Sequence, residues 1–236
     1  MNKKTLIILP TLNEIKNIKI LYKKLKKINL NLNFLFIDDN SLDGTREYIH
    51  ILEKREKNIN FIFNKKRKGI GRAHKDGLAW AYKKKYDYAI TMDSDLAHHP
   101  KYIRHILKKK DTSHIILGSR YIKRNSTPGW SKLRIFLSRS AHFFFKVIYK
   151  SNLDSTNAFR LYNLKLINSK FLNDLEYDDY EFFFTSLIAL KKKGYKINQI
   201  PMMIYGRSHG GSKMLLKHVF KSISTMFLFY FKSKTL

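Results

Sequence analysis

The chain has no cysteine, only four prolines and 18 acidic residues among its 236 positions. Without cysteine it cannot form a disulfide, a zinc-thiolate site or an iron–sulfur cluster, and it cannot use a catalytic thiol. No uncharged apolar run reaches the length of about 18 residues that a membrane-spanning helix needs. The first apolar run, Thr5–Pro10, is too short for a secretory signal and predicts a buried strand instead.

Basic residues are abundant, with 47 Lys+Arg and a formal net charge of +29. Hydrophobic residues at 44% and aromatic residues at 14% are sufficient for a packed core, so global disorder is excluded. Many lysines stand where helices are expected to end, which also fits a solvated helix terminus. The charge otherwise indicates an anionic partner: nucleic acid, an anionic membrane surface or a phosphorylated small molecule.

Apolar runs and helical periodicity alternate along the first half of the chain. Strands are expected at Thr5–Leu9, Phe34–Ile37, Ile59–Phe63 and Tyr88–Met92. Helices are expected from Glu14 to about Ile28, over about Thr45–Lys57 and from the Gly69 and Gly71 loop to about Lys85. This alternation predicts an α/β fold with a mainly parallel sheet and helices on both faces. Ligands in such folds bind at the carboxyl ends of the strands.

The second half is less regular. We expect a strand at Ile115–Leu117, a long helix over Trp130–Tyr149, a short strand pair around Ala158–Tyr162, a helix near Tyr180–Lys193 and an extended segment from Tyr195 to Tyr205. Residues 1–213 then form one domain. Residues 214–236 form an amphipathic C-terminal helix, which is expected either to lie in a membrane interface or to pack on the domain.

The strongest local motif is Asp93-Ser94-Asp95, two carboxylates one residue apart at the end of an expected buried strand. Two hard anions at one point suit Mg²⁺ or Mn²⁺, with the remaining ligands supplied by water and a diphosphate. Alone, such a motif more often marks an ordinary turn at the end of a strand, and its place after the fourth strand of an α/β sheet is what favours the metal site. The neighbouring His98 and His99 are expected to pack in the loop or face solvent rather than bind metal.

Further polar clusters follow the first two strands. Asp39 stands where an acidic residue can bind ribose hydroxyls or a base edge, and Glu14 either contacts a nucleoside or lies in the first turn of a helix. Asp43 is expected to cap the following helix. Gly69-Ile70-Gly71 does not follow the first strand, so it is a poor dinucleotide-binding fingerprint.

Together these blocks resemble the dolichyl-phosphate (polyprenyl-phosphate) mannose synthases of glycosyltransferase family 2, which have the GT-A fold. The resemblance extends from Pro10 to Lys213 and lies in five ordered segments: 92–100, 118–121, 129–139, 154–162 and 207–213. It implies an inverting transfer of mannose from GDP-mannose to a polyprenyl (dolichyl-type) phosphate at the cytoplasmic face of a membrane, by a peripherally associated enzyme. A lipid phosphate is largely dianionic at neutral pH and needs no general base.

The resemblance also implies roles for single residues. The nucleotide-sugar donor is assigned to Pro10, Glu14, Ile37, Asp39, Asp93, Ser94, Asp95, Arg120, Arg207 and Lys213, with Asp93 and Asp95 holding the metal. The catalytic set is Asp95, Arg120, Arg134, Ser138 and Arg207, of which Arg134 and Ser138 grip the lipid phosphate.

Three positions depart from the family pattern. Leu12 replaces an aromatic residue near the base, Ala97 replaces a Gln or Ser beside the metal, and Thr185 stands at a usual glutamate position. A UDP-sugar donor, giving glucose or N-acetylglucosamine, is an alternative, because base recognition in this fold often uses backbone groups that the sequence does not reveal. A non-catalytic, basic nucleic-acid-binding protein is a more distant one, since no zinc-finger, RNP-type or basic-zipper pattern is present. Whether a separate membrane subunit takes part stays open.

Overall fold

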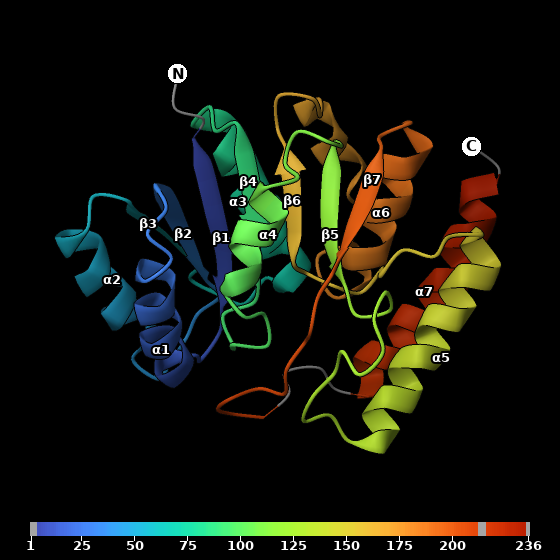
Figure 1. The fold of residues 1–236 in the computed structure, drawn as a ribbon, viewed down its shortest axis with the longest axis horizontal. Coiled ribbons are helices and arrows are strands. Elements are labelled where there is room, and N and C mark those ends of the chain that lie inside the picture. Colours follow the sequence, from blue (N-terminus) through green and yellow to red (C-terminus); the bar gives the residue numbers. More distant parts are fainter. Residues whose placement is uncertain (1–3, 212–215, 235–236) are drawn as a thin grey trace.

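The computed structural model of the chain describes residues 4–211 and 216–234. A seven-stranded sheet in the order β3-β2-β1-β4-β6-β5-β7 lies at its centre, with helices on both faces (Figure 1). The strands are β1 (Thr5–Thr11), β2 (Leu32–Asp38), β3 (Ile59–Phe63), β4 (Tyr88–Thr91), β5 (Ile115–Ser119), β6 (Arg160–Asn163) and β7 (Ile197–Pro201). The helices are α1 (Ile15–Lys26), α2 (Thr45–Arg55), α3 (Ile70–Lys83), α4 (Lys101–Leu107), α5 (Lys132–Tyr149), the 3₁₀ helix η1 (Ser169–Asp174), α6 (Glu181–Lys192) and α7 (Leu216–Lys234).

The mainly parallel sheet is confirmed, with β6 as its antiparallel strand. β6 pairs antiparallel with both β4 and β5, and the other neighbouring strands run parallel. The strand pair expected around Ala158–Tyr162 was wrong, because β6 is one strand whose two edges are already filled by β4 and β5. The extended segment near Tyr195–Tyr205 contains β7 at the edge of the sheet.

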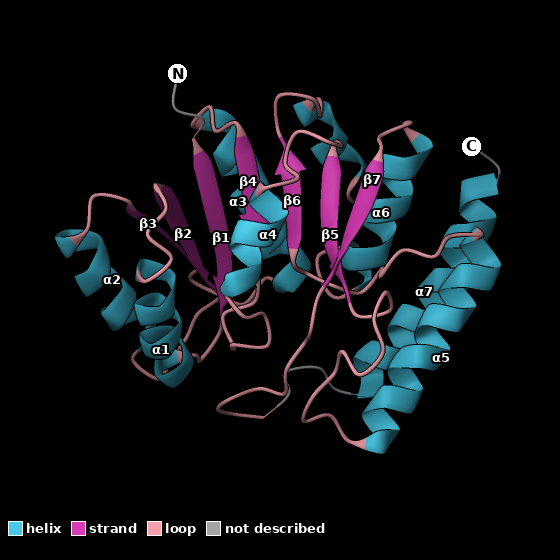
Figure 2. Cartoon of the chain, in the orientation of Figure 1, coloured by secondary structure: helices cyan, strands magenta, loops and turns pink. Residues whose placement is uncertain are grey.

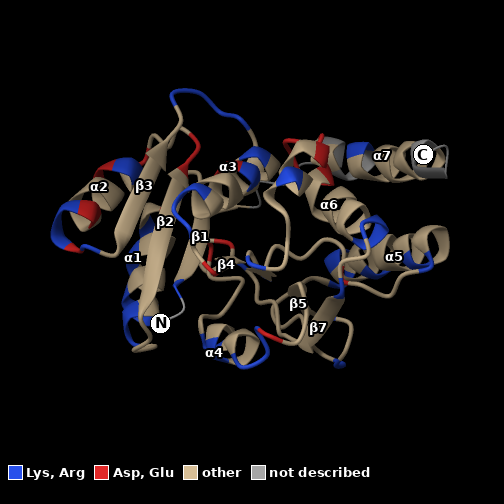
Figure 3. Cartoon of the chain, turned by 90° about the horizontal axis from the view of Figure 1, so that it is seen from above, with Lys and Arg blue, Asp and Glu red and all other residues tan. Residues whose placement is uncertain are grey.

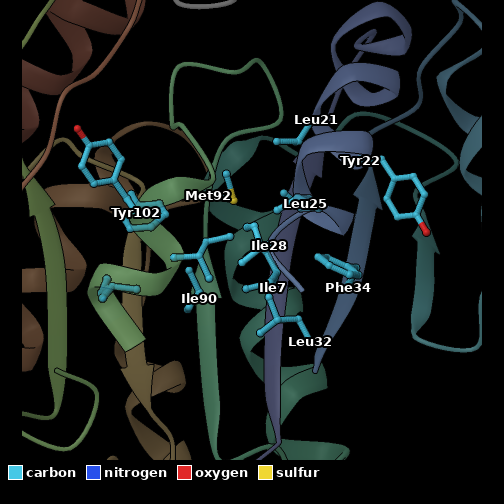
Figure 4. Packing of buried hydrophobic residues seen from close by; sticks show 14 of the residues in the cluster. Ile7, Leu21, Tyr22, Leu25, Ile28, Leu32, Phe34, Ile90, Met92 and Tyr102 are labelled. Carbon is cyan, nitrogen blue, oxygen red and sulfur yellow. The ribbon is translucent and has the colours of Figure 1, made fainter. Parts of the chain in front are cut away.

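Two apolar clusters cover the two faces of the sheet. On one face, β1 and β4 pack against α1 and α4 through side chains such as Ile7, Ile90 and Leu25 (Figure 4). On the other face, Ile8 and Leu35 pack with residues of α3 and α6. Successive residues of β1 therefore serve opposite faces, as the period of a strand requires, and both faces of the strand are buried.

Helices α5 and α7 lie outside this sandwich. Phe145 of α5, Phe184 and Ile188 of α6 and Met226 of α7 form a third buried cluster. The Tyr149 hydroxyl donates to the Met226 carbonyl at 2.6 Å, which ties the two helices together. Within residues 4–211 and 216–234, no helix combines the length and the apolarity needed to span a bilayer.

The carboxyl ends of the parallel strands share one edge of the sheet. The loops after β1, β2, β4 and β5 gather below that edge in the view of Figure 2. The strand order reverses between β1 and β4, whose neighbours lie on opposite sides. A crevice outside such a reversal is where parallel α/β sheets bind ligands, so the side chains at this edge are the candidates for a binding site.

Candidate active site

Asp93 and Asp95 stand in a tight turn immediately after β4. The Asp93 N–H donates to Nδ1 of the buried His98 at 3.0 Å, and the Ala97 N–H donates to Asp95 Oδ1 at 3.0 Å. Ser94 Oγ donates to the Pro10 carbonyl at 2.7 Å and so fastens the turn to the end of β1. His98 uses its ring nitrogen to hold the turn, which agrees with the packing role expected for it.

The two carboxylates are close enough to influence each other. Burial raises the pKa of Asp93, the charge of Asp95 raises it further, and His98, Arg207 and Arg120 oppose this shift. A divalent cation between the carboxylates would relieve their repulsion, and carboxylate oxygens are ligands that Mg²⁺ and Mn²⁺ prefer. Within the described residues no group of three or more acidic or histidine side chains could hold a metal ion. Asp93 and Asp95 would therefore supply two carboxylate ligands, and carboxylate oxygens suit a hard divalent cation.

Arg207 connects this turn to the start of α1. Its Nη1 lies 3.3 Å from Asp95 Oδ2, and its Nη2 donates to the buried carboxylate of Glu14. Glu14 also accepts from Asn17 Nδ2 at 2.5 Å, and the same amide group contacts the His209 carbonyl at 3.1 Å. Burial raises the pKa of Glu14, whereas Asn17 and Arg207 lower it. The loop after β7 is thereby held over the ends of β1 and β4.

Arg120 follows β5 and forms a buried ion pair with Asp154. Its backbone N–H, Nε and Nη2 all donate at 2.9 Å to the Asp154 carboxylate, which is completely inaccessible to solvent. Nη2 also reaches Thr156 Oγ1 at 3.0 Å, and Nη1 reaches Ser138 Oγ at 3.5 Å. Asp154 therefore fixes the plane of the guanidinium, and Nη1 is the group that faces α5.

Arg134 and Ser138 lie one turn apart on α5, as expected, but their partners differ. The Arg134 guanidinium carbon lies 3.8 Å from the centre of the Trp130 ring, a stacked cation–π contact. Ser138 Oγ lies 2.8 Å from the Tyr121 hydroxyl and beside Arg120. Burial and the charges of Arg120 and Arg207 lower the pKa of Arg134, although a guanidinium stays protonated at any physiological pH. Arg207 thus contacts the Asp93–Asp95 turn directly, and the charges of Arg120 and Arg134 act on it from the α5 side.

Of the other residues predicted to bind the donor, only some have side chains or backbone groups at the site. Pro10 and Glu14 lie at this edge of the sheet. Both oxygens of Asp39 accept backbone N–H groups, from Lys68 at 2.8 Å and from Gly69 at 3.0 Å, so Asp39 holds the loop before α3. Ile37 is fully buried and its side chain belongs to the core. Lys213 lies outside the described residues.

The three residues that depart from the family pattern, Leu12, Ala97 and Thr185, each have a defined environment in the structure. Leu12 is half-buried after β1, and Ala97 supplies backbone groups that bind Asp95 and Tyr205. Thr185 is buried inside α6, where its hydroxyl donates to the Glu181 carbonyl at 2.8 Å. The Thr185 hydroxyl therefore bonds within α6 and does not point into the site.

Sequence reasoning did not single out Asp154, Trp130 or Asn17 for these roles. Asp154 and Trp130 were part of the quoted motif blocks, but their pairing with Arg120 and Arg134 depends on long-range packing. Asn17 carries the weakest signal, a polar residue within the apolar period of α1, where a buried amide indicates a fixed partner.

Comparison of the sequence with known proteins identifies the family to which the chain belongs. The family described as "Glycosyl transferase family 2" matches residues 6–176. The chain is 25% identical over 212 residues to an undecaprenyl-phosphate mannosyltransferase of Micrococcus luteus, covering 89% of this chain and 87% of the relative. It is 24% identical over 215 residues to a polyprenol monophosphomannose synthase of Mycolicibacterium smegmatis, covering 90% and 81%.

Solved structures share the fold at lower identity. Glucosyl-3-phosphoglycerate synthase from Mycobacterium tuberculosis, in complex with Mn²⁺, UDP and glucosyl-3-phosphoglycerate, has a TM-score of 0.68 at 16% identity over 97% of this chain and 80% of its own. A mannosyltransferase from Pyrobaculum calidifontis, in complex with GDP-Man and Mn²⁺, has a TM-score of 0.57 at 12% identity over 100% and 65%. The expected GT-A fold is confirmed. The chain belongs to glycosyltransferase family 2, and it is a glycosyltransferase.

Proposed function

We propose that the enzyme transfers mannose from GDP-mannose to a polyprenyl phosphate with inversion at the anomeric carbon. The observation that carries the proposal is that Arg207 contacts Asp95 at 3.3 Å, while Arg120 and Arg134 lie on the α5 side of the same site, where Arg120 contacts Ser138 and both guanidinium groups lie over Trp130. Such a site suits two phosphorylated substrates at once. The names of the two sequence relatives, an undecaprenyl-phosphate mannosyltransferase and a polyprenol monophosphomannose synthase, support this choice of acceptor and sugar.

The donor is assigned to the loops after β1, β4 and β7. Asp93 and Asp95 would hold Mg²⁺ or Mn²⁺, which would neutralise charge on the leaving diphosphate. Arg207, already 3.3 Å from Asp95, is positioned to exchange that carboxylate for a diphosphate oxygen. Pro10 and Glu14 are assigned to the nucleoside side of the same crevice, and Ser94 keeps the two loops together. Contacts of Ile37 and Asp39 with the nucleotide remain part of the proposal, together with Lys213.

The acceptor is assigned to the α5 side. A guanidinium binds a phosphate through two parallel N–H donors, and the Arg134 guanidinium lies over the Trp130 ring. Arg120 Nη1 and Ser138 Oγ lie beside it and would bind further phosphate oxygens. A dianionic phosphate attacks without a general base, so Arg134, Arg120 and Ser138 act by positioning the nucleophile. Direct displacement from an α-linked donor gives a β-linked lipid phosphate.

The acceptor is a membrane lipid, so the proposal places the enzyme at the cytoplasmic face as a peripheral protein. The charge of +29 favours an anionic bilayer. Membership of an enzyme family leaves no reason to retain the nucleic-acid-binding alternative.

A donor panel tests the proposal. Purified enzyme would be incubated with polyprenyl phosphate, Mn²⁺ and, in separate reactions, GDP-mannose, UDP-glucose or UDP-N-acetylglucosamine. We expect lipid-linked sugar only with GDP-mannose. Product formed only with a UDP-sugar would replace the donor assignment and keep the acceptor. Transfer to a soluble acceptor but never to the lipid phosphate would refute the acceptor assignment.

A further inference from the structure

Arg160, the first residue of β6, is a buried cation that the described residues surround with neutral hydrogen-bond acceptors. Only 1% of it is exposed to solvent. Nε donates to the Asn157 carbonyl at 2.8 Å, Nη1 to Ser186 Oγ at 2.9 Å, and Nη2 to the carbonyls of Ser155 and Phe183 at 3.2 and 2.7 Å. Burying a charge without an opposite charge is costly unless several hydrogen bonds compensate. The guanidinium and these four acceptors therefore hold one another in place.

Helix α6 supplies two of the acceptors and no charge close to them. Its acidic residue is Glu181 at the first position, and the helix is uncharged from there to Lys191, so most of α6 is tan in Figure 3. Glu181 pairs with Lys221 of α7 at 3.1 Å. Arg160 therefore acts through hydrogen bonds, and its planar fork of N–H donors fixes several carbonyl groups at once.

The other two acceptors, the carbonyls of Ser155 and Asn157, belong to the loop that leads into β6. The remaining residues of this loop, Asp154 and Thr156, bind Arg120 on the acceptor side of the site. Nη2 of Arg120 donates to Asp154 Oδ1 at 2.9 Å and to Thr156 Oγ1 at 3.0 Å. The buried arginine of β6 thus holds the backbone that presents both partners of Arg120.

The anchor of this loop is a well-packed helix. The Phe183 carbonyl and Ser186 Oγ lie within one turn of α6, whose residues Phe182 and Leu187 are buried in the core on one face of the sheet. A loop lacks the regular backbone hydrogen bonds of a helix or strand, so its carbonyl groups need other partners when they are buried. Arg160 supplies them and connects the 154–157 loop to α6.

The donor side of the site is held by other contacts. Arg207 bonds to Glu14 and lies 3.3 Å from Asp95. The turn that carries Asp95 is held by the ring of His98. These bonds are made without Arg160, so its loss should alter the acceptor side and leave the donor side in place.

We propose that Arg160 is a positioning residue for the acceptor phosphate: it holds the 154–157 loop so that Arg120 directs Nη1 toward Ser138. The inference rests on the proposed lipid-phosphate acceptor and adds a residue that does not touch it, because the Arg160 guanidinium is buried behind the loop. A displacement of about 1 Å in a binding group can cost about 100-fold in rate. A small shift of this loop is therefore enough to affect transfer.

Tryptophan fluorescence gives a measurement that does not depend on turnover. With Trp80→Phe, Trp130 is the only tryptophan of the chain. The guanidinium carbons of Arg120 and Arg134 lie 5.5 Å and 3.8 Å from the centre of its ring. Trp130 emission should therefore report both the position of Arg120 and the binding of a short, water-soluble prenyl phosphate. Donor binding would be measured by calorimetry with Mn²⁺ and GDP or UDP, whichever binds the wild type.

Three variants in this background test the role. Arg160→Met removes the donors and should weaken binding of prenyl phosphate at least ~10-fold while nucleotide binding stays within ~2-fold. Arg160→Lys should recover only part of this loss, because an ammonium cannot reach all four acceptors. Ser186→Ala removes one acceptor in α6 and should weaken prenyl phosphate binding about 3-fold. It is the milder variant that decides the question if Arg160→Met does not fold.

Leu52→Ala is the matched control for a general loss of stability. Leu52 is buried in α2, and its truncation leaves a cavity in the core. This variant should bind prenyl phosphate and nucleotide as the wild type does. In transfer assays, Arg160→Met should raise the KM for prenyl phosphate and leave the KM for the sugar nucleotide unchanged. Added to Asp154→Asn, it should weaken acceptor binding little further, because both act through Arg120.

Wild-type acceptor binding by Arg160→Met and Ser186→Ala would overturn the proposal. So would an equal weakening of acceptor and nucleotide binding, a loss of the same size in Leu52→Ala, or full additivity with Asp154→Asn. A wild type that binds nucleotide but no prenyl phosphate would refute the proposed acceptor instead. The emission of the free enzyme then decides: a shift in Arg160→Met that is absent from Leu52→Ala supports the positioning of Arg120, and an unshifted emission overturns it.

Discussion

Replacing Asp154 with Asn tests whether the Arg120–Asp154 pair holds the acceptor side of the site. The wild-type carboxylate accepts three N–H groups of Arg120 at 2.9 Å and is fully buried. The amide introduced by Asp154→Asn would retain one acceptor oxygen of similar shape but no charge, leaving the guanidinium buried without a counter-charge. Breaking one partner of a buried pair costs about 3–5 kcal/mol, so we expect the free energy of unfolding to fall by about 3 kcal/mol.

Urea unfolding followed by circular dichroism measures this loss. Glu56→Gln is the matched control, because Glu56 pairs with Lys26 at 2.6 Å with both side chains partly in solvent, and such pairs contribute below about 1 kcal/mol. Adding Arg120→Met to the Asp154 variant should restore part of the stability, since the unpaired charge is then removed. A loss for Asp154→Asn no larger than that of the control would refute the buried-pair argument.

Three further predictions concern the substrates and the residues that hold them. Asp95→Ala should reduce transfer at least ~100-fold and weaken binding of Mn²⁺ measured by calorimetry in the presence of nucleoside diphosphate. Arg134→Lys should keep donor binding but lose at least ~10-fold in transfer to lipid phosphate, because lysine lacks the paired donors. Burial raises the pKa of Glu14 above its ordinary value of 4.5, so the folded protein loses stability as the pH rises from about 4.5 through that raised pKa. Arg207 lowers the pKa of Glu14, so Arg207→Ala should raise it further and make the free energy of unfolding fall more steeply with pH.

Each of these has a result that contradicts it. Near-normal turnover of Asp95→Ala in EDTA would remove the metal role. Wild-type transfer by Arg134→Lys would leave only generic charge attraction at that position. Urea midpoints of Arg207→Ala that follow the wild-type pH profile would show that Arg207 does not stabilise the Glu14 carboxylate.

Much of the fold could be predicted from local patterns. Continuous apolar runs end in polar clusters at Pro10, Asp38 and Asp93, and these clusters meet at one edge of the sheet because parallel strands share their carboxyl ends. The short α4 and the direction of β6 were not predictable in the same way. β6 has only four residues, and its antiparallel pairing with β4 and β5 is decided by long-range packing.

The site was predictable in part for the same reason. Asp93-Ser94-Asp95 is a local motif, whereas the Arg120–Asp154 pair joins positions 34 residues apart and the Arg207–Glu14 pair joins positions 193 apart. The exposed apolar residues of α5, such as Leu133, Phe136 and Val147, were not predicted, because a helix with apolar residues on two faces resembles a buried helix until its neighbours are known.

The product formed from GDP-mannose and polyprenyl phosphate tests the central claim most directly. The enzyme would be incubated with both substrates, Mn²⁺ and anionic vesicles, and the lipid product examined by mass spectrometry and by NMR of the anomeric carbon. The account predicts one hexose added to the lipid phosphate in the β configuration. An α-linked product would contradict direct displacement, and the absence of any mannosyl lipid under conditions in which another sugar nucleotide is consumed would contradict the assigned reaction.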